Sequence, residues 1–169
     1  MDASKIDEID VGQSIVPAIL NGDVDAIMGW SFNQGVQAQT QGCSCEWKMF
    51  TDFGQPDVPN STITVNSDFA KKDPKQVQAF VDATIKGWQY AADHPDEALE
   101  MLYDVYPEID KEYNDAKLPL VLELMGTPDT FGQFDAAKWQ ALEDFYSEQG
   151  TLTAEVELDG GVYDAGYTK

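Results

Sequence analysis

A helix stop followed by a short apolar run constrains the fold of this chain most strongly. Asn21-Gly22 is a pair that readily adopts the left-handed conformation that ends helices. The preceding helix, residues 13–21, is predicted by aliphatic residues at helical spacing: Ile15, Val16, Ile19 and Leu20. Residues 24–29 then have the length and apolar composition of a short buried strand. This order predicts an αβ unit and an α/β fold.

Aromatic and polar side chains follow the predicted strand directly: Trp30, Ser31, Phe32, Asn33 and Gln34. In open α/β sheets, small molecules bind in the crevice beyond the carboxyl ends of the strands. We therefore expect these five residues to bind a ligand. Trp30 and Phe32 would supply stacking or apolar area, and the other three would supply hydrogen bonds that fix the ligand's orientation. For Trp30, simple packing is the alternative.

Further helices are predicted where capping and stop residues bracket a periodic apolar pattern. Asp73-Pro74 opens the clearest of these. The predicted helical ranges are 73–94, 95–106, 110–125 with Pro119 inside, and 135–149, together with a mostly solvated helix over 33–41 that breaks at Gly42. Strands are predicted over 47–51 and 61–66, where β-branched or alternating residues occur. Residues 4–11 suit a half-buried strand or a loop.

The charge balance limits the partners of the chain. It has 31 acidic and 10 basic residues, for a formal net charge of −21, and every basic residue is Lys. Such a charge repels nucleic acid and anionic lipid surfaces, so no nucleic-acid partner is expected. The bidentate fork of Arg, which grips sulfonates and phosphates, is missing. We therefore favour a neutral or cationic heterocycle as the ligand over a sulfonate.

Three segments, in order, resemble one known family. They are the turn at residues 21–26 (Asn-Gly-Asp-Val-Asp-Ala), the strand, turn and long helix at 61–91, and the final helix with its exit around Phe131-Gly132, Asp135, Trp139 and 148–152. Together they are similar to the carboxyl-terminal part of type II periplasmic solute-binding proteins, in the group that binds thiamine-pyrimidine precursors, sulfonates and taurine. The likeness spans about residues 9 to 155, and the first half of such a protein and its export signal are absent from the chain.

The resemblance implies a two-lobe, type II periplasmic-binding-protein fold of which this chain is a helix-rich portion. Residues 1–50 would be the remainder of the second lobe, and residues 51–169 the carboxyl-terminal portion of the first lobe. It also implies a small-molecule ligand, an ABC transporter membrane permease as the partner of the parent protein, and a periplasmic or extracytoplasmic location. As written, the chain has no signal peptide and is expected to be soluble and unexported.

Two other functions stay open. One is an enzyme of pyrimidine-precursor biosynthesis in the same superfamily, with a cofactor and iron. The other is a non-catalytic module that associates with itself through exposed strand edges. Because no nucleophile elbow, phosphate loop or paired-carboxylate pattern occurs, we expect a binding protein with no catalytic residues, no cofactor and no metal.

The remaining suggestive residues have simpler interpretations. Cys43 and Cys45 are the only cysteines. We interpret them as ordinary loop thiols, with a local disulfide or a metal site as alternatives. The enzymes of the resembled superfamily carry a cysteine-rich run for iron after the strand at Trp47, whereas these cysteines precede it. His94 precedes a proline at a helix boundary, which favours a capping or surface role. Asp23 and Asp25 do not complete a calcium loop.

Overall fold

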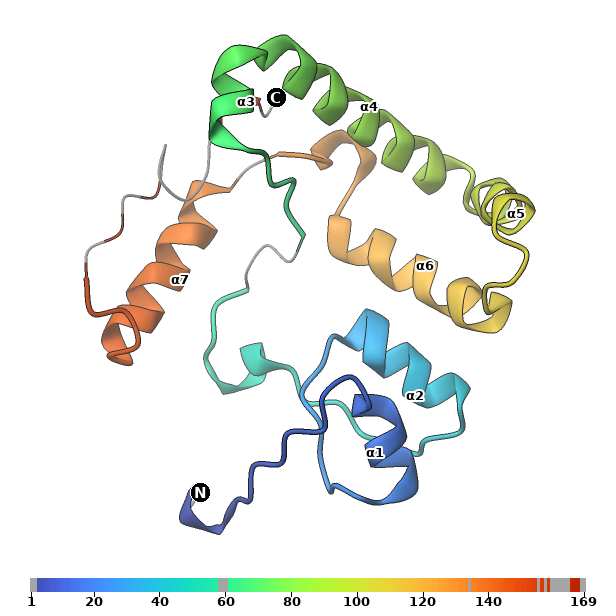
Figure 1. The fold of residues 1–169 in the computed structure, drawn as a ribbon, viewed down its shortest axis with the longest axis vertical. Helices are drawn as coiled ribbons and strands as arrows, with labels where there is room; N and C mark the ends of the chain where they lie inside the picture. The colour runs from blue at the N-terminus through green and yellow to red at the C-terminus, as the bar shows by residue number, and fades with distance from the viewer. Residues whose placement is uncertain are drawn as a thin grey trace. The chain divides into compact units, whose positions relative to one another are not determined.

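The computed structural model describes residues 3–57, 61–133, 135–154, 156, 158 and 165–167. The α-helices found there are α1 (Ile15–Asn21), α2 (Val36–Thr40), α3 (Ser67–Lys72), α4 (Pro74–Asp93), α5 (Pro95–Val105), α6 (Lys111–Met125) and α7 (Ala136–Glu148), as Figure 1 shows. Short 3-10 turns cover Ala3–Lys5, Phe50–Phe53 (η3), Pro128–Thr130 (η4) and Ala165–Tyr167 (η5), and a π-helical turn covers Ser31–Gly35 (η2). The chain therefore belongs to the helix-rich class in its described residues.

The chain forms two compact units. One consists of Met1–Trp47 and Leu99–Leu124, and the other of Lys48–Ala98 and Met125–Lys169. The assignment of residues 1–50 and 51–169 to two lobes stays a prediction.

The predicted helix boundaries are confirmed where local capping groups set them. The Asp73 side chain accepts a hydrogen bond from the Gln76 N–H and opens α4, while Asp135 accepts from two N–H groups at the start of α7. Gly22 ends α1 in the left-handed conformation, at a φ of 75°. These signals lie within four residues of the boundary that they set, so the sequence alone carries them.

The predicted strands are not strands in the described residues. Residues 24–29 and 61–66 are irregular, and residues 47–51 run from irregular chain into η3. A strand needs a neighbouring strand for its backbone hydrogen bonds, and the described residues pair no two extended segments. Met28, predicted to be buried, is 76% exposed. The helix-rich part of the fold prediction is confirmed, whereas the described residues contain none of the strands that an α/β fold requires. Residues 6–11 form an exposed loop apart from half-buried Val11.

Two helical details also differ from the prediction. The helix expected over 33–41 is η2 followed by α2, and it is not mostly solvated, because Gly35, Val36 and Ala38 are buried. The short helix α3 was not predicted. Its cap is Asn66, whose side-chain oxygen accepts hydrogen bonds from the N–H groups of Asp68 and Phe69.

In the first unit, the buried apolar side chains come from two short helices. Val16 and Ala18 of α1 are buried, as are Val36 and Ala38 of α2, and the two helices lie in contact (Figure 1). Small residues on both helices let their backbones approach closely. These four side chains are the buried apolar core of the first unit among the described residues.

In the same unit, a tyrosine of α5 is bonded to α6. The Tyr103 hydroxyl donates to Asp115 Oδ1 at 2.5 Å, and Lys111 Nζ lies 4.9 Å from the centre of its ring. Desolvation and this hydrogen bond raise the pKa of Tyr103 to about 12. The phenol therefore holds its proton more tightly than in an unfolded chain.

In the second unit, α4 contacts α3, η4 and η5. Val77 of α4 and Phe131, which follows η4, are buried. Gln89 of α4 donates a side-chain hydrogen bond to the Pro128 carbonyl oxygen at 3.0 Å. The Lys138 ammonium of α7 pairs with the exposed carboxylate of Asp57. The chain that precedes α7 is therefore fixed along α4 by one buried ring and one hydrogen bond.

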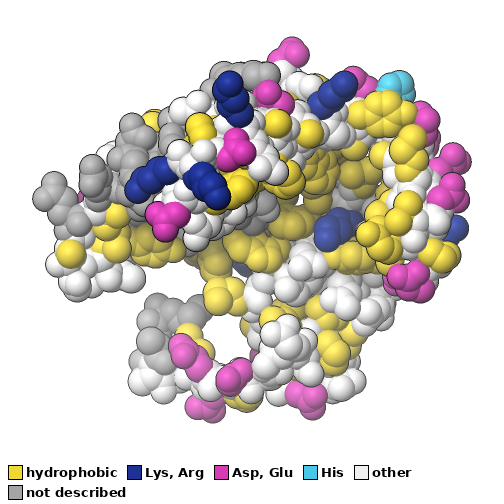
Figure 2. All heavy atoms as spheres, turned by 45° about the horizontal axis from the view of Figure 1, so that its top comes forward, with side chains coloured by type: hydrophobic (Ala, Val, Ile, Leu, Met, Phe, Trp, Pro, Cys, Tyr) yellow, Lys and Arg dark blue, Asp and Glu magenta, His cyan; other side chains and the backbone are white. Residues whose placement is uncertain are grey.

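Large apolar side chains also lie on the surface of the described residues, and Figure 2 shows many of them in yellow. Among the most exposed are Met28, Phe53, Phe80, Val105 and Ile9. Extensive exposed apolar area is typical of surfaces that another part of a protein, a partner or a ligand covers.

Gly132 offers a test of packing in the second unit. Its φ is +74°, and an added Cβ would lie 2.5 Å from Ile85 Cδ1, whereas Gly150 has a φ of +71° with nothing within 4 Å of an added Cβ. Gly150→Ala should therefore cost only the backbone strain, about 1–2 kcal/mol, and Gly132→Ala should cost about 1–3 kcal/mol more through overpacking. Urea unfolding of both variants measures the difference. Equal unfolding free energies would show that Ile85 does not contact this turn.

Tyr103 should also show a measurable pH effect. Its pKa is raised above the ordinary value of 10.0, so its contribution to the unfolding free energy is complete below pH 10 and is lost as the pH rises toward about 12. Absorbance titration of the wild type minus that of Tyr103→Phe isolates this phenol. In Asp115→Asn, its pKa should fall because the carboxylate charge is gone. An unchanged titration in Asp115→Asn would exclude the Asp115 hydrogen bond as a cause.

Candidate ligand-binding site

The loop from Trp30 to Gly35 forms a closed π-helical turn. The N–H groups of Asn33 and Gly35 both donate to the Trp30 carbonyl oxygen at 3.0 Å. Gln34 Oε1 accepts from the Trp30 N–H at 2.9 Å, so both sides of Trp30 are bonded to its own loop. Single π-turns are frequent at functional sites because they redirect side chains that a regular helix would align.

A glycine and a tryptophan anchor this turn. Gly35 is buried, and an added Cβ would lie 3.0 Å from Trp47 Cζ2. A side chain at this position would press on the indole, which would have to shift by a few tenths of an ångström. The carboxyl end of the turn is therefore fixed by packing, and the end at Trp30 by hydrogen bonds.

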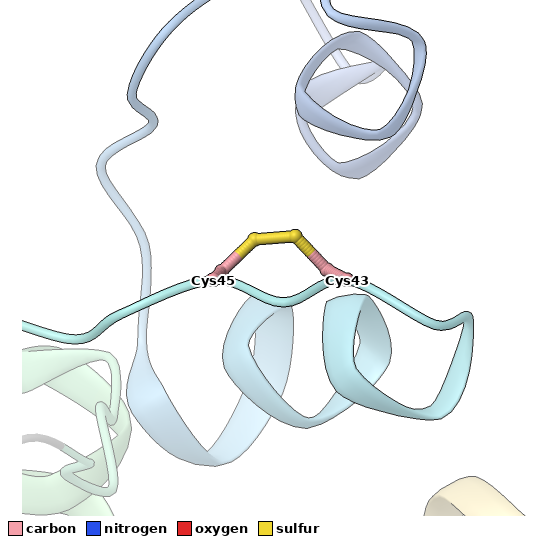
Figure 3. The surroundings of a disulfide bond; sticks show 2 residues. All are labelled: Cys43 and Cys45. Carbon is pink, nitrogen blue, oxygen red and sulfur yellow. A yellow bond between two sulfur atoms is a disulfide. The ribbon is translucent and has the colours of Figure 1, made fainter.

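Cys43 and Cys45 form a disulfide, which corrects the interpretation of both as free thiols. The bond joins the two cysteines across one intervening residue, in the segment that follows α2 (Figure 3). The Cys43 N–H also donates to the Ala38 carbonyl oxygen at 2.9 Å. Together these bonds fix the path of the chain from the end of α2 to Trp47.

The two aromatic residues of the predicted site lie together. The rings of Trp30 and Phe32 have their centres 6.1 Å apart and their planes at 29°. Trp30 is 52% exposed, and Phe32 is half-buried. An exposed aromatic face of this kind can stack on a flat ring.

The polar residues of the predicted site have different surroundings. Ser31 is half-buried, and its carbonyl oxygen accepts from the Val36 N–H. The side-chain oxygen of Gln34 accepts from the Trp30 N–H, so the side-chain N–H₂ is the group that would be left for a ligand. Asn33 is bonded away from the loop, because Tyr113 of α6 donates its hydroxyl to Asn33 Oδ1 at 2.5 Å. Binding of a ligand by these residues stays a prediction.

The sequence did not point to Tyr113 and Lys117, two residues of α6 that are hydrogen-bonded to the loop or to each other. Lys117, one turn after Tyr113 on α6, donates to the Tyr113 hydroxyl oxygen at 3.1 Å and lies 5.1 Å from the centre of its ring. Tyr113 is 80 residues from Asn33 along the chain, so no local pattern connects them. Only the tertiary contact reveals that α6 contributes to the candidate site.

The other suggestive residues form no site in the described residues. His94 caps the end of α4, is exposed and has its ring 4.7 Å from that of Tyr90, in agreement with a capping or surface role. Among the described residues, no group of three or more His, Cys, Asp or Glu side chains could hold a metal ion. None of the described helices has the length and apolar character that a membrane span requires.

Comparison with known proteins places these features in a family. The family model described as NMT1/THI5 like matches residues 1–98. The chain is 26% identical, over 82% of its own residues, to the formylaminopyrimidine-binding protein of Halalkalibacterium halodurans. It is 22% identical, over 88% of its residues, to the riboflavin-binding protein RibY of Chloroflexus aurantiacus. No solved structure matches the chain.

The chain is shorter than these relatives. The matched residues make up 44% of the length of each of the two relatives. The family match nevertheless covers more than half of this chain, in agreement with the likeness of its motifs. The chain belongs to the NMT1/THI5-like family.

Proposed function

We propose that this chain is part of a solute-binding protein that holds a small, flat, neutral or cationic heterocycle for an ABC importer. The observation that carries the proposal is the loop at Trp30–Gln34, where an exposed tryptophan and a half-buried phenylalanine lie together beside amide groups on a fixed backbone. The two curated relatives are named as binders of a formylaminopyrimidine and of riboflavin, and both ligands contain flat heterocyclic rings.

In this proposal, each residue of the loop has a defined role. Trp30 stacks on the ring of the ligand, with Phe32 supporting it. The side-chain amides of Asn33 and Gln34 offer N–H₂ donors, because the oxygen of each is already bonded within the protein. Ser31 offers its hydroxyl. Sites of this composition, mostly apolar with a few convergent polar groups, are typical of small-molecule binding.

The charge of the chain supports a ligand that is not an anion. The net charge is −21 and no Arg is present. Lys117, which is linked to Asn33 of the loop through Tyr113, donates to the Tyr113 hydroxyl and lies over its ring. A sulfonate would meet an unfavourable field without a bidentate partner.

The parent protein would bind its ligand between two lobes that close by hinge motion, and would deliver it to a membrane permease. An extracytoplasmic location is supported by the Cys43–Cys45 disulfide, because disulfides persist mainly in oxidising compartments. The same bond counts against the alternative of an iron-dependent enzyme, since bonded cysteines offer no thiolate to a metal. The exposed apolar side chains favour a second candidate, a module that associates with itself.

The proposal predicts a ligand-dependent rise in melting temperature. The complete product of the gene that encodes this chain, and the 169-residue chain alongside it, would be screened with a formylaminopyrimidine, other aminopyrimidines, riboflavin, taurine and alkanesulfonates. A ligand that binds only the native state must raise the melting temperature by mass action. Shifts with the heterocycles and none with the sulfonates are expected. Tight binding of sulfonates alone would overturn the charge argument.

Trp30→Ala should then weaken binding of the heterocycle by about 10- to 100-fold, because stacked aromatic contacts with a base contribute about 1–3 kcal/mol. The matched control is Phe80→Ala, which removes another exposed aromatic ring, 61% exposed, from the other unit. Isothermal titration calorimetry measures the affinity of both variants. Equal affinities of the two variants would show that Trp30 does not stack on the ligand.

A further inference from the structure

Three side chains form a polar chain that ends at the candidate site. Lys117 Nζ donates to the Tyr113 hydroxyl oxygen at 3.1 Å, and the Tyr113 hydroxyl donates to Asn33 Oδ1 at 2.5 Å. All three residues belong to the same unit and are half-buried. This row of hydrogen-bonded side chains connects α6 to the loop that carries Trp30 and Phe32.

The chemistry of these groups sets the direction of the hydrogen bonds. A lysine ammonium has three donors and no acceptor, so Tyr113 must accept from Lys117. The tyrosine then has one proton to donate, and among the described residues its one acceptor is Asn33 Oδ1. If the Asn33 amide were flipped, its N–H₂ group would face the Tyr113 hydroxyl proton, and that proton would have no acceptor. The carbonyl oxygen of Asn33 is thus held toward Tyr113.

The nitrogen of the amide is consequently directed elsewhere. Asn33 Nδ2 donates no hydrogen bond to any of the described residues. We propose that Tyr113 and Lys117 are positioning residues that present Asn33 Nδ2 as a donor to the ligand, so that the ligand offers a carbonyl oxygen or a ring nitrogen at this point. This inference rests on the proposed function, and it narrows the substrate class to heterocycles with an acceptor on the edge that meets Asn33.

The chain contains a matched control for this arrangement. Lys111 lies over the Tyr103 ring as Lys117 lies over that of Tyr113, and both tyrosine hydroxyls donate to a side-chain oxygen. Tyr103 donates to Asp115 instead of to the loop. Tyr103→Phe therefore removes a comparable tyrosine hydrogen bond, and Lys111→Met a comparable cation over a ring, and neither variant changes a group that contacts Asn33.

The decisive variant is Asn33→Asp. The carboxylate keeps an oxygen for the Tyr113 hydroxyl, so the link to α6 remains, but the donor becomes a second acceptor. The probes are a formylaminopyrimidine and the same aminopyrimidine without its formyl group, with affinities measured by calorimetry on the complete gene product. Asn33→Asp should bind the formyl compound about 10- to 100-fold more weakly, and should lose less affinity for the amine.

Tyr113→Phe should weaken binding of the formyl compound by about tenfold, since the amide is no longer held in one orientation. Tyr103→Phe and Lys111→Met should change the affinity by less than about twofold. If Asn33→Asp or Tyr113→Phe binds both probes as tightly as the wild type, the inference is wrong while the proposed function stands. If the wild type binds no heterocycle at all, the proposed function fails.

A ligand-free measurement tests the same geometry. The NMR signals of the Asn33 side-chain amide should be those of one fixed orientation in the wild type. In Tyr113→Phe and Lys117→Met they should move and exchange faster with water, whereas the control variants should leave them in place. Amide signals that do not respond to Tyr113→Phe would overturn the positioning role, whichever ligand the protein binds.

Discussion

The close approach of the Trp47 indole to the backbone of Gly35 is the constraint on which the candidate site depends. The glycine lets the indole lie close to the backbone at the end of η2, next to the buried residues Val36 and Ala38 of α2. With the other end closed on the Trp30 carbonyl oxygen, the turn has little freedom left. A backbone that is ordered before the ligand arrives avoids part of the entropy cost of binding. Trp30 can therefore remain half exposed without being loosely held.

The disulfide contributes to this order locally. Cys43 and Cys45 are two residues apart, so their bond closes a very short loop and removes little entropy from the unfolded chain. Its effect is on the direction of the backbone between α2 and Trp47. In combination with the bond from Cys43 to Ala38, it brings the indole back to the glycine at the start of α2. A local covalent bond thus supports a contact between residues 12 positions apart.

The sequence predicts those parts of the fold whose causes are local. The starts of α4 and α7 follow from aspartate caps, and the end of α1 follows from Gly22. The predicted strands do not occur in the described residues, because a strand forms only beside a partner strand and the periodicity of the sequence does not reveal a partner. Asn66 did carry the signal for α3, but the β-branched run before it favoured a strand over a cap. Of the candidate site, the five loop residues come from the sequence and their role stays a prediction, whereas Tyr113 and Lys117 are found only through tertiary contact.

The contact of Lys117 with Tyr113 also suggests how a strongly acidic protein could favour a neutral ligand. The ammonium contacts the hydroxyl and the ring of Tyr113, so its charge acts on the site through a phenol and an amide. An amide donor polarised in this way strengthens a hydrogen bond to a carbonyl oxygen. It supplies too little charge to offset the net charge of −21 for a fully anionic group. In the proposed site, the loop would combine a stacking surface, which most flat rings fit, with a directed donor that distinguishes among them.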